Sequence, residues 1–232
     1  MARAAPDDRL RAILRAATEV FIAQGYRRTQ MSDVSAAAGL AKGTLYLYFE
    51  SKEALFDLVV RNADQDGPME PAPELPVSTP QAGETLQYVA TALAEGSTFP
   101  ALQAALSRRR VADVRTELEG ILRELYAVLF QHRRGLKLVD RCAQDHPDLA
   151  RLWFQGGREV LLGLLVQYLD RRASRLRPVP DRAIAARMVI ENLVFWAVHR
   201  HWDPAPQRMD EKVAEDTVVQ LLLDALVKEV PA

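Results

Sequence analysis

The stretch that decides the fold is FIAQGYRRTQMSDVSAAAGLAKGTLYLYFESKEALFDL, residues 21–58. Its apolar spacing predicts the end of one helix, a short helix over 32–38, and a second short helix that starts near 41 and runs to Phe49. Gly39 lies between them and suits the left-handed backbone position that ends a helix. Two short helices joined by a brief turn that contains glycine are typical of a DNA-reading helix-turn-helix.

The second short helix carries the side chains that such a motif needs. Its cationic and hydroxyl donors are Lys42, Thr44, Tyr46 and Tyr48. Leu45 and Phe49 are spaced i, i+4 and are predicted to face inward. Because such donors bind phosphates and base edges, we expect this helix to contact DNA, with Lys52 and the 29–32 entrance holding the phosphate backbone. The predicted DNA-binding residues are Thr29, Ser32, Lys42, Gly43, Thr44, Tyr46, Leu47, Tyr48 and Lys52.

These residues resemble the TetR family of bacterial transcriptional regulators. The family pattern joins an aromatic, Gly-Tyr/Phe, Thr, Ile/Val-Ala, Ala-Gly, Gly-Thr-Leu-Tyr, a second aromatic and Ser-Lys-Glu-x-Leu. Its counterparts here are Phe21, Gly25-Tyr26, Thr29, Val34-Ser35, Ala38-Gly39, Gly43-Thr44-Leu45-Tyr46, Phe49 and Ser51-Lys52-Glu53-Ala54-Leu55. Two positions depart from it: Gln30 replaces the usual Ser/Thr, so that Thr29 is expected to cap the short helix, and Ser35 replaces Ala.

Helical periodicity continues through the chain and predicts an all-α protein. A first helix over 8–24 has one apolar stripe, which the two short helices are expected to cover. We therefore predict an N-terminal three-helix helix-turn-helix DNA-binding head plus a C-terminal helical ligand-binding and dimerisation body. The expected parts are the head over 1–50, a bridging helix over 51–65, a Pro-rich loop over 66–80 and the body over 81–232.

Two late helices of the body are predicted to form a dimer interface. Further helices are expected at 81–95, 99–109, 111–132, 135–145, 147–176, 181–202 and 210–229. Those at 147–176 and 181–202 are apolar over so wide an arc that they need cover from two sides. The resemblance implies a four-helix bundle with their symmetry mates. The candidate interface residues are Leu161, Leu164, Leu165, Tyr168, Met188, Asn192, Phe195 and His199. The Gly156-Gly157 pair is expected to mark a close helix approach or a kink.

The resemblance also implies a ligand cavity within the body. The candidates are large apolar or amphipathic side chains on several helices and one amide, and most of the large side chains are expected to belong to the core. They are Phe99, Leu102, Gln103, Tyr126, Phe130, Trp153 and Phe154. An apolar lining favours a small hydrophobic or aromatic effector over a sugar or nucleotide. The sequence does not specify which molecule it is.

The composition of the chain limits which classes of protein it can belong to. Hydrophobic residues make up 49% of the 232-residue chain, enough to bury a core. No stretch is long and apolar enough to span a membrane, and the start lacks an apolar signal core, so a cytoplasmic location is expected. Cys142 is the sole cysteine and excludes an internal disulfide framework. The net charge of −1 is a weak electrostatic footprint for a DNA binder.

An enzyme is not expected, and neither a cofactor nor a metal site is predicted. His199-x-His201-x-Asp203 contains metal-ligand residue types, but residues two apart on a helix do not share a face. Catalytic triads, phosphate-binding glycine loops and paired-carboxylate motifs are not visible in the sequence.

These features predict a homodimeric, sequence-specific transcription regulator. The favoured form is a repressor that a small hydrophobic ligand releases from a palindromic double-stranded operator. One alternative is a DNA-binding regulator that a protein partner controls without small-molecule sensing. The other is a helical carrier or enzyme that keeps the head only as part of its fold. The donor side chains of the second short helix are intact, and this argues against the carrier or enzyme. The sequence does not specify the operator, the sign of regulation or any role of the Pro-rich loop.

Overall fold

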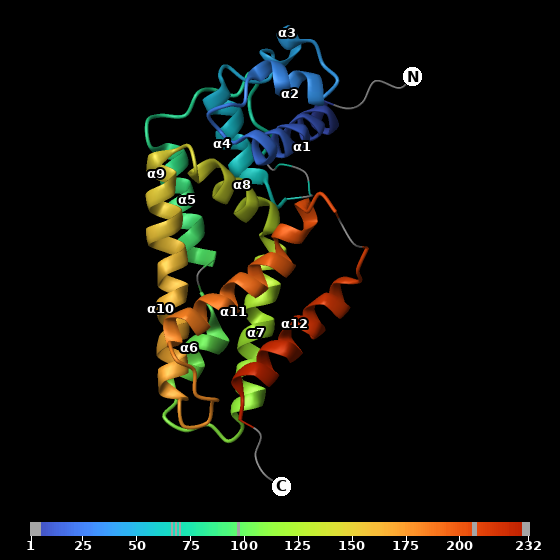
Figure 1. The fold of residues 1–232 in the computed structure, drawn as a ribbon. Helices are drawn as coiled ribbons and strands as arrows, with labels where there is room; N and C mark the ends of the chain where they lie inside the picture. The colour runs from blue at the N-terminus through green and yellow to red at the C-terminus, as the bar shows by residue number, and fades with distance from the viewer. Residues whose placement is uncertain are drawn as a thin grey trace. The chain divides into compact units, whose positions relative to one another are not determined.

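The computed structural model describes residues 6–65, 67, 69, 71–96, 98–205 and 208–228. They form an all-α fold, and this confirms the predicted fold class (Figure 1). The α-helices are α1 (Pro6–Gln24), α2 (Met31–Ala37), α3 (Lys42–Leu45), α4 (Lys52–Asn62), α5 (Glu84–Gly96), α6 (Pro100–Ser107), α7 (Val114–Gln131), α8 (Arg133–Ala143), α9 (Pro147–Ala150), α10 (Glu159–Arg171), α11 (Arg182–Ala197) and α12 (Glu211–Leu226).

Contacts divide the chain into two compact units. The head unit comprises residues 1–93 and 134–154, and the body unit comprises 94–133 and 155–232. The head unit therefore contains more than the three-helix head, because α4, most of α5, nearly all of α8, and α9 belong to it. This partition by contacts does not follow the boundaries predicted at 50, 65 and 80. The predicted division into head, bridging helix, loop and body stays a prediction.

The core of the head unit is built on the apolar stripe of α1. Its buried members are Leu10, Ile13, Leu14, Ala17 and Phe21. α2 and α4 both pack on α1, and α3 packs on α2. Leu45 and Phe49 are completely buried, so the prediction that both face inward is confirmed. Burial of a large apolar side chain contributes about 1.5–3 kcal/mol, so these two residues fix the α3 turn on the head.

Glycines set the turns of the head. Gly39 has φ = +65° at the end of α2, as its position predicts. Gly25 has φ = +83° after α1, and a Cβ built there would lie 2.6 Å from Asp145 Oδ2. The same carboxylate oxygen accepts the backbone N–H of Arg27 at 3.1 Å. The segment after α8 therefore holds the turn between α1 and α2, and only glycine fits at position 25.

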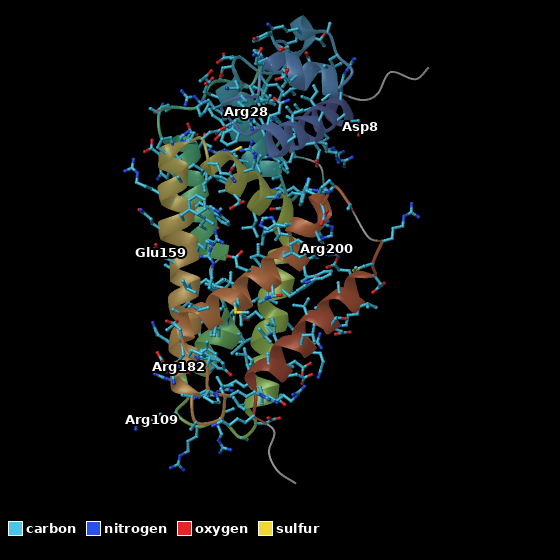
Figure 2. The ribbon with its side chains drawn as sticks, in the orientation of Figure 1. Asp8, Arg28, Arg109, Glu159, Arg182 and Arg200 are labelled. Carbon is cyan, nitrogen blue, oxygen red and sulfur yellow. The ribbon has the colours of Figure 1, made fainter. Side chains whose placement is uncertain are left out.

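The body unit is a bundle in which α11 packs on α7, α10 and α12. A buried ion pair joins α7 to the end of α10, because Arg172 Nε donates to Glu117 Oε2 at 2.7 Å. Arg172 Nη2 also donates to the carbonyl of Ala105 at 2.8 Å. By contrast, Arg109 and Arg182 project from the exposed surface of this unit (Figure 2).

Two helices predicted as continuous are interrupted. The segment 147–176 contains α9, a π-helical stretch at Arg151–Arg158, and α10, after which 172–175 are turns instead of the predicted helix. The adjacent glycines fall inside the π-helical stretch, where their low helix propensity favours a widened turn. A Cβ at Gly156 would meet nothing within 4 Å, so no close approach of another described residue explains this glycine. The segment 181–202 ends as an α-helix at Ala197 and continues as a 3₁₀ turn, His199–Trp202.

The Pro-rich stretch returns to the head. The backbone N–H of Val77 donates to the carbonyl of Tyr48 at 2.8 Å, and the N–H of Glu50 donates to the carbonyl of Val77 at 3.1 Å. These bonds form an isolated parallel bridge between Phe49 and Val77. The loop that was predicted over 66–80 is therefore anchored near its end.

Candidate nucleic-acid interface

The segment 42–49, which we call the α3 turn, exposes both polar and apolar side chains to solvent. Leu47 and Tyr46 are 68% and 45% exposed, and Lys42 is also exposed. Thr44 and Tyr48 are half-buried along the same turn. A cation, hydroxyl donors and an apolar side chain on one exposed turn suit phosphates, base edges and thymine methyl groups.

The α-helical part of this turn is shorter than predicted. α3 ends at Leu45, and the predicted helix to Phe49 continues as turns. The backbone N–H groups of Tyr48 and Phe49 both donate to the carbonyl of Leu45, at 3.0 and 3.1 Å. The backbone thus stays coiled, while the isolated bridge to Val77 ends the helix. Gly43 is exposed, and a Cβ there would meet nothing within 4 Å.

The entrance to α2 differs from the prediction at Thr29. This side chain is buried, and its Oγ1 donates to the carbonyl of Gly25 at 2.7 Å, so Thr29 neither caps α2 nor reaches solvent. Gln30 is the N-cap, and its N–H donates to Asp33 Oδ2 at 2.8 Å. An acidic residue three positions after the cap is the sequence signal that would have identified it. Ser32 is half-buried and donates to Gln30 Oε1 at 3.4 Å.

Lys52 is engaged inside the head unit. Its Nζ donates to the carbonyls of Tyr26 and Thr29 at 3.1 and 3.2 Å, and it lies 4.5 Å from the centroid of the Tyr26 ring. The predicted contact of Lys52 with the phosphate backbone is therefore replaced by a structural role. It fixes the start of α4 to the turn that leads into α2.

Tyr26 makes a second link to α4. Its hydroxyl donates to Glu53 Oε1 at 3.0 Å, and its ring packs 4.7 Å from that of Phe56. Burial, followed by the Glu53 carboxylate, raises the pKa of Tyr26 above its ordinary value. A backbone hydrogen bond at Glu53 and the Tyr26 hydroxyl lower the pKa of the carboxyl group despite partial burial. The pair is therefore a neutral phenol and a carboxylate at neutral pH.

Two cations that the sequence reasoning passed over lie in the turn before α2. Arg27 and Arg28 are exposed, and the Nε of Arg28 donates to the carbonyl of Gln24 at 3.0 Å (Figure 2). An adjacent arginine pair directly before the helix-turn-helix was the available signal. Guanidinium groups at this position add candidate phosphate contacts to the α3 set.

The predicted dimer residues fall into two groups. On α11, Met188 is 60% and Phe195 is 42% exposed, and Asn192 is exposed between them. Leu161, Leu164 and His199 are half-buried. Leu165 and Tyr168 are buried in the core of the body unit, which leaves them no surface to offer a second copy. The α11 residues therefore stay candidates, and these two do not.

The predicted pocket residues are divided between the two units. Phe99, Leu102 and Tyr126 are buried in the body unit, and the Tyr126 hydroxyl donates to Glu211 Oε1 at 2.6 Å. Gln103 is exposed.

The remaining three aromatics have partners of their own. Phe130 lies under Arg133, whose Cζ is 4.3 Å from the ring centroid. Trp153 and Phe154 belong to the head unit, where Trp153 Nε1 donates to Asp140 Oδ1 at 2.9 Å. The seven residues predicted to line one cavity in the body therefore belong to two different units.

The geometry of the head agrees with a family comparison. Residues 13–59 match the family described as bacterial regulatory proteins, tetR family. Its head carries the DNA-binding domain of the TetR family. This confirms the resemblance, which rests on residues of the same segment. In the described part of the chain, no helix has the length and apolar character needed to cross a membrane.

Relatives share mainly the head. An uncharacterized HTH-type transcriptional regulator, YhgD of Bacillus subtilis, is 48% identical over 50 residues, which cover 22% of this chain and 26% of that protein. The Bacillus subtilis fatty acid metabolism regulator protein is 49% identical over 41 residues, covering 18% and 21%. The matched segment therefore spans 26% or less of the length of these two relatives.

Solved structures share the whole fold at low identity. The ketosteroid transcriptional regulator KstR2 of Mycobacterium tuberculosis is 16% identical with a TM-score of 0.55, covering 95% of this chain and 96% of that one. AibR in complex with isovaleryl coenzyme A and operator DNA is 19% identical with a TM-score of 0.50, covering 93% and 98%. These similarities show a common all-α fold.

Proposed function

We propose that this TetR-family chain is a homodimeric transcriptional repressor that binds a palindromic operator and leaves it when a small hydrophobic effector binds. The observation that carries the proposal is the α3 turn. Lys42, Tyr46 and Leu47 are exposed on it, while Leu45 and Phe49 hold it to the core from behind. Exposed donors on a rigid support are what sequence reading in a major groove requires.

The small size of one head supports the proposed dimer. A single short helix reads few base pairs, and two copies spaced by about 34 Å, one turn of DNA, double the contacts. The exposed side chains of Ile184, Met188 and Phe195 on α11 form an apolar face that supports self-association. The low net charge of the chain makes a second copy more important, because each head supplies little electrostatic attraction.

An effector with an acyl chain is the class that we favour. AibR was solved in complex with isovaleryl coenzyme A and operator DNA. One relative is named a fatty acid metabolism regulator protein. In this chain, the buried side chains of α6 and α7 make the interior of the body unit apolar, and an acyl group would have to enter between them. Release requires only that the effector bind the DNA-free state about 5–150-fold more tightly.

Selection of bound chromosomal fragments tests the DNA-binding part. The wild-type protein should enrich fragments with an inverted repeat, and Lys42→Ala should weaken binding to them and reduce the salt slope by about one. Tyr46→Phe should cost about 1 kcal/mol of binding free energy through one lost hydroxyl contact. Lys212→Ala, which removes an exposed lysine of α12, is the matched control and should bind like the wild type. If folded Lys42→Ala and Tyr46→Ala variants bind the selected fragments like the wild type, α3 is not the reading element.

The effector part has its own test. The enriched fragment is titrated with protein in the presence of isovaleryl coenzyme A, a long-chain acyl coenzyme A or free coenzyme A. We expect the acyl forms to release DNA and free coenzyme A to leave it bound, because the apolar group supplies the differential affinity. Release by free coenzyme A, or by none of the three, would contradict the acyl-effector proposal while leaving DNA binding intact.

A further inference from the structure

One end of the body unit is strongly cationic. Figure 1 shows the α6–α7 connection, the α10–α11 connection and the end of α12 together at this end. The segments 105–112, 171–180 and 226–228, which we call the arginine surface, contain seven arginines and one lysine but no aspartate or glutamate. The whole chain, by contrast, balances 30 basic residues against 31 acidic ones. The positive charge of the body unit is therefore concentrated here.

Hydrogen bonds hold the α6–α7 and α10–α11 connections against each other. The buried Arg172 donates from Nη2 to the carbonyl of Ala105 at 2.8 Å and to the carbonyl of Arg108 at 3.3 Å. The neighbouring Arg171 donates from Nη1 to the carbonyl of Leu106. The arginines of the two connections therefore belong to one continuous surface, although more than sixty residues separate them in sequence.

The end of α12 is joined to the same surface. Leu176 and Val227 form an isolated antiparallel bridge. The backbone N–H of Lys228 donates to the carbonyl of Arg175 at 3.4 Å, and its Nζ donates to the carbonyl of Ser174 at 3.1 Å. These bonds fix the backbone that carries the arginines, so that the side chains extend from a supported platform.

Most arginines of this platform reach solvent, and Figure 2 shows Arg109 extending from it. A bond from a guanidinium to a main-chain carbonyl, as at Arg171, orients the side chain without cancelling its charge. Arg172 differs, because the buried carboxylate of Glu117 lies 2.7 Å from its Nε. The exposed arginines are Arg108, Arg109, Arg110, Arg171, Arg175 and Arg177.

The carboxylates that flank the arginine surface along the chain have other roles. Asp113 and Asp181 cap the N-termini of α7 and α11, where the helix dipole attracts a negative charge. Asp170 lies 2.9 Å from Arg182, which is outside the surface. These carboxylates therefore do little to neutralise the arginines, and the repulsion between like charges favours a bound polyanion.

The residue types favour the phosphates of duplex DNA among polyanions. The planar guanidinium fork matches the geometry of phosphate oxygens and keeps its charge at every physiological pH. The three segments contain no aromatic residue on which the bases of a single strand would stack. They also contain none of the large apolar side chains that are exposed elsewhere, which argues against insertion into a membrane.

We propose that the arginine surface is a second, sequence-independent binding site for the phosphate backbone of duplex DNA. The adjacent Arg108, Arg109 and Arg110 contact successive phosphates, and Arg171 and Arg175 extend the contact from the α10–α11 connection. The site belongs to the body unit and does not use the α3 turn, so it goes beyond operator recognition and does not depend on it. Binding releases counterions and weakens steeply with added salt.

Fluorescence anisotropy of the full chain with a labelled random-sequence duplex, measured over a series of salt concentrations, tests the proposal. The double variant Arg109→Gln, Arg110→Gln should weaken binding about tenfold at low salt and reduce the salt slope by about two. The matched control Arg208→Gln, Lys212→Gln also removes two exposed cations of the body unit, but outside the arginine surface. It should bind like the wild type.

A variant of the head separates this site from the proposed operator recognition. Lys42→Ala changes the α3 turn and should weaken operator binding. Adding Arg109→Gln and Arg110→Gln to Lys42→Ala should still reduce the salt slope for random-sequence duplex by about two, because the two sites contact DNA independently. A failure of operator recognition therefore leaves this effect in place.

Three results would overturn the proposal. The first is equal affinity and salt slope in the wild type and in the folded Arg109→Gln, Arg110→Gln variant, an outcome that leaves operator binding by the α3 turn intact. The second is equal weakening in the Arg208→Gln, Lys212→Gln control, which would show that only net charge matters. The third is sedimentation with vesicles of phosphatidylserine and phosphatidylcholine without duplex binding, which would assign the surface to an anionic membrane.

Discussion

The hydroxyl of Thr79 lies 2.8 Å from Oγ of Ser51, which caps the N-terminus of α4. The N–H of Thr79 donates to Glu50 Oε2 at 2.9 Å, and two residues earlier in the chain the N–H of Val77 donates to the carbonyl of Tyr48. The end of the Pro-rich stretch therefore contacts the junction between the DNA-reading turn and α4. A segment that reads in sequence as a connector acts as a support for the candidate DNA surface.

Loss of this support should weaken operator binding indirectly. Thr79→Val removes the hydroxyl that meets Ser51 and keeps the side-chain shape, so we expect the free energy of unfolding to fall by about 1 kcal/mol. Operator affinity should fall by a similar free energy, because the turn that carries Tyr48 is less well fixed. Thermal unfolding and fluorescence anisotropy with labelled operator measure the two effects.

Ser78→Ala is the control for this prediction. It removes a neighbouring hydroxyl whose residue is exposed, and it should leave both measurements unchanged. If Thr79→Val matches Ser78→Ala in both stability and DNA affinity, the contact with Ser51 does not support the reading turn.

Dimer formation should depend on the exposed face of α11. Phe195→Asp places a charge in a face that we expect to be buried between copies, so it should produce a monomer in sedimentation velocity at micromolar concentration and abolish tight operator binding. Leu221→Asp changes an equally apolar and more exposed residue of α12 and should stay dimeric. A wild-type chain that is monomeric at this concentration, or a Phe195→Asp variant that is still dimeric, would refute the α11 interface.

The fold of the head was predictable because its signals are local. The i, i+4 spacing of Leu45 and Phe49 specifies which face is buried, and Gly39 marks the end of α2 from its residue type alone. Both depend on residues within one or two helical turns. The same reasoning explains why the all-α class could be predicted along the whole chain.

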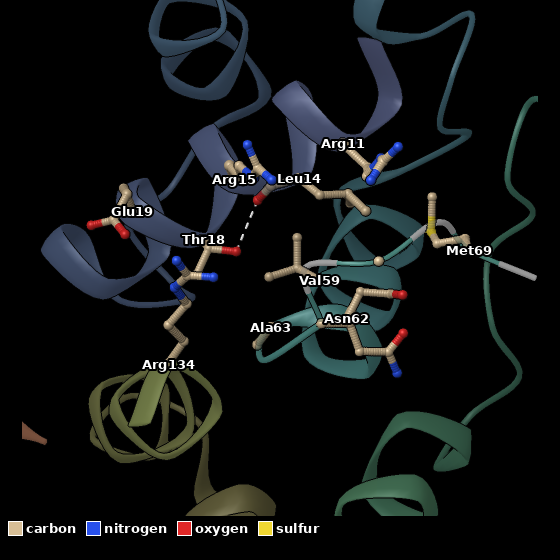
Figure 3. A pocket seen from close by; sticks show the side chains of 12 residues that line it. Arg11, Leu14, Arg15, Thr18, Glu19, Val59, Asn62, Ala63, Met69 and Arg134 are labelled. Atoms are coloured by element: carbon tan, nitrogen blue, oxygen red, sulfur yellow. Dashed lines mark hydrogen bonds between the residues drawn. The ribbon is translucent and has the colours of Figure 1, made fainter. Parts of the chain in front are cut away.

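The roles that sequence reasoning missed depend on contacts between distant segments. Lys52 was expected to meet phosphate, but its ammonium group donates to the carbonyls of Tyr26 and Thr29, more than twenty residues earlier. Asp145 fills the space beside Gly25 through a contact that no local pattern records. A cavity in the head unit has the same origin, because Leu14 on α1 and Arg134 on α8 both line it and α8 begins more than seventy residues after the end of α4 (Figure 3).

The buried ion pair of the body unit should contribute strongly to the free energy of unfolding. The side chains of Glu117 and Arg172 are 8% and 3% exposed, and Glu117→Gln leaves the guanidinium without its counter-charge. Breaking such a pair costs about 3–5 kcal/mol. Glu119→Gln also removes an i, i+4 partner of an arginine, but this carboxylate is 40% exposed and its loss should cost at most about 1 kcal/mol. Urea unfolding compares the two, and equal losses would contradict the burial argument.

Cys142 should be protected from alkylation until the head unit unfolds. Burial, followed by the Asp145 carboxylate, raises the pKa of its thiol to about 12. The reactive thiolate is therefore nearly absent from the folded chain at pH 8.5, whereas about half of an unfolded chain carries it. We expect iodoacetamide at pH 8.5 to label the chain in urea and not in buffer.

The same raised pKa predicts the sign of the pH dependence. The folded state keeps the proton that the unfolded state loses, so this group's contribution to stability is complete below pH 8.5 and decreases as the pH rises toward 12. Cys142→Ala should therefore show a smaller loss of stability between pH 8 and 10 than the wild type, measured by urea unfolding. Rapid labelling of the folded wild type at pH 8.5, or an identical pH slope in Cys142→Ala, would show that the thiol titrates near its ordinary value.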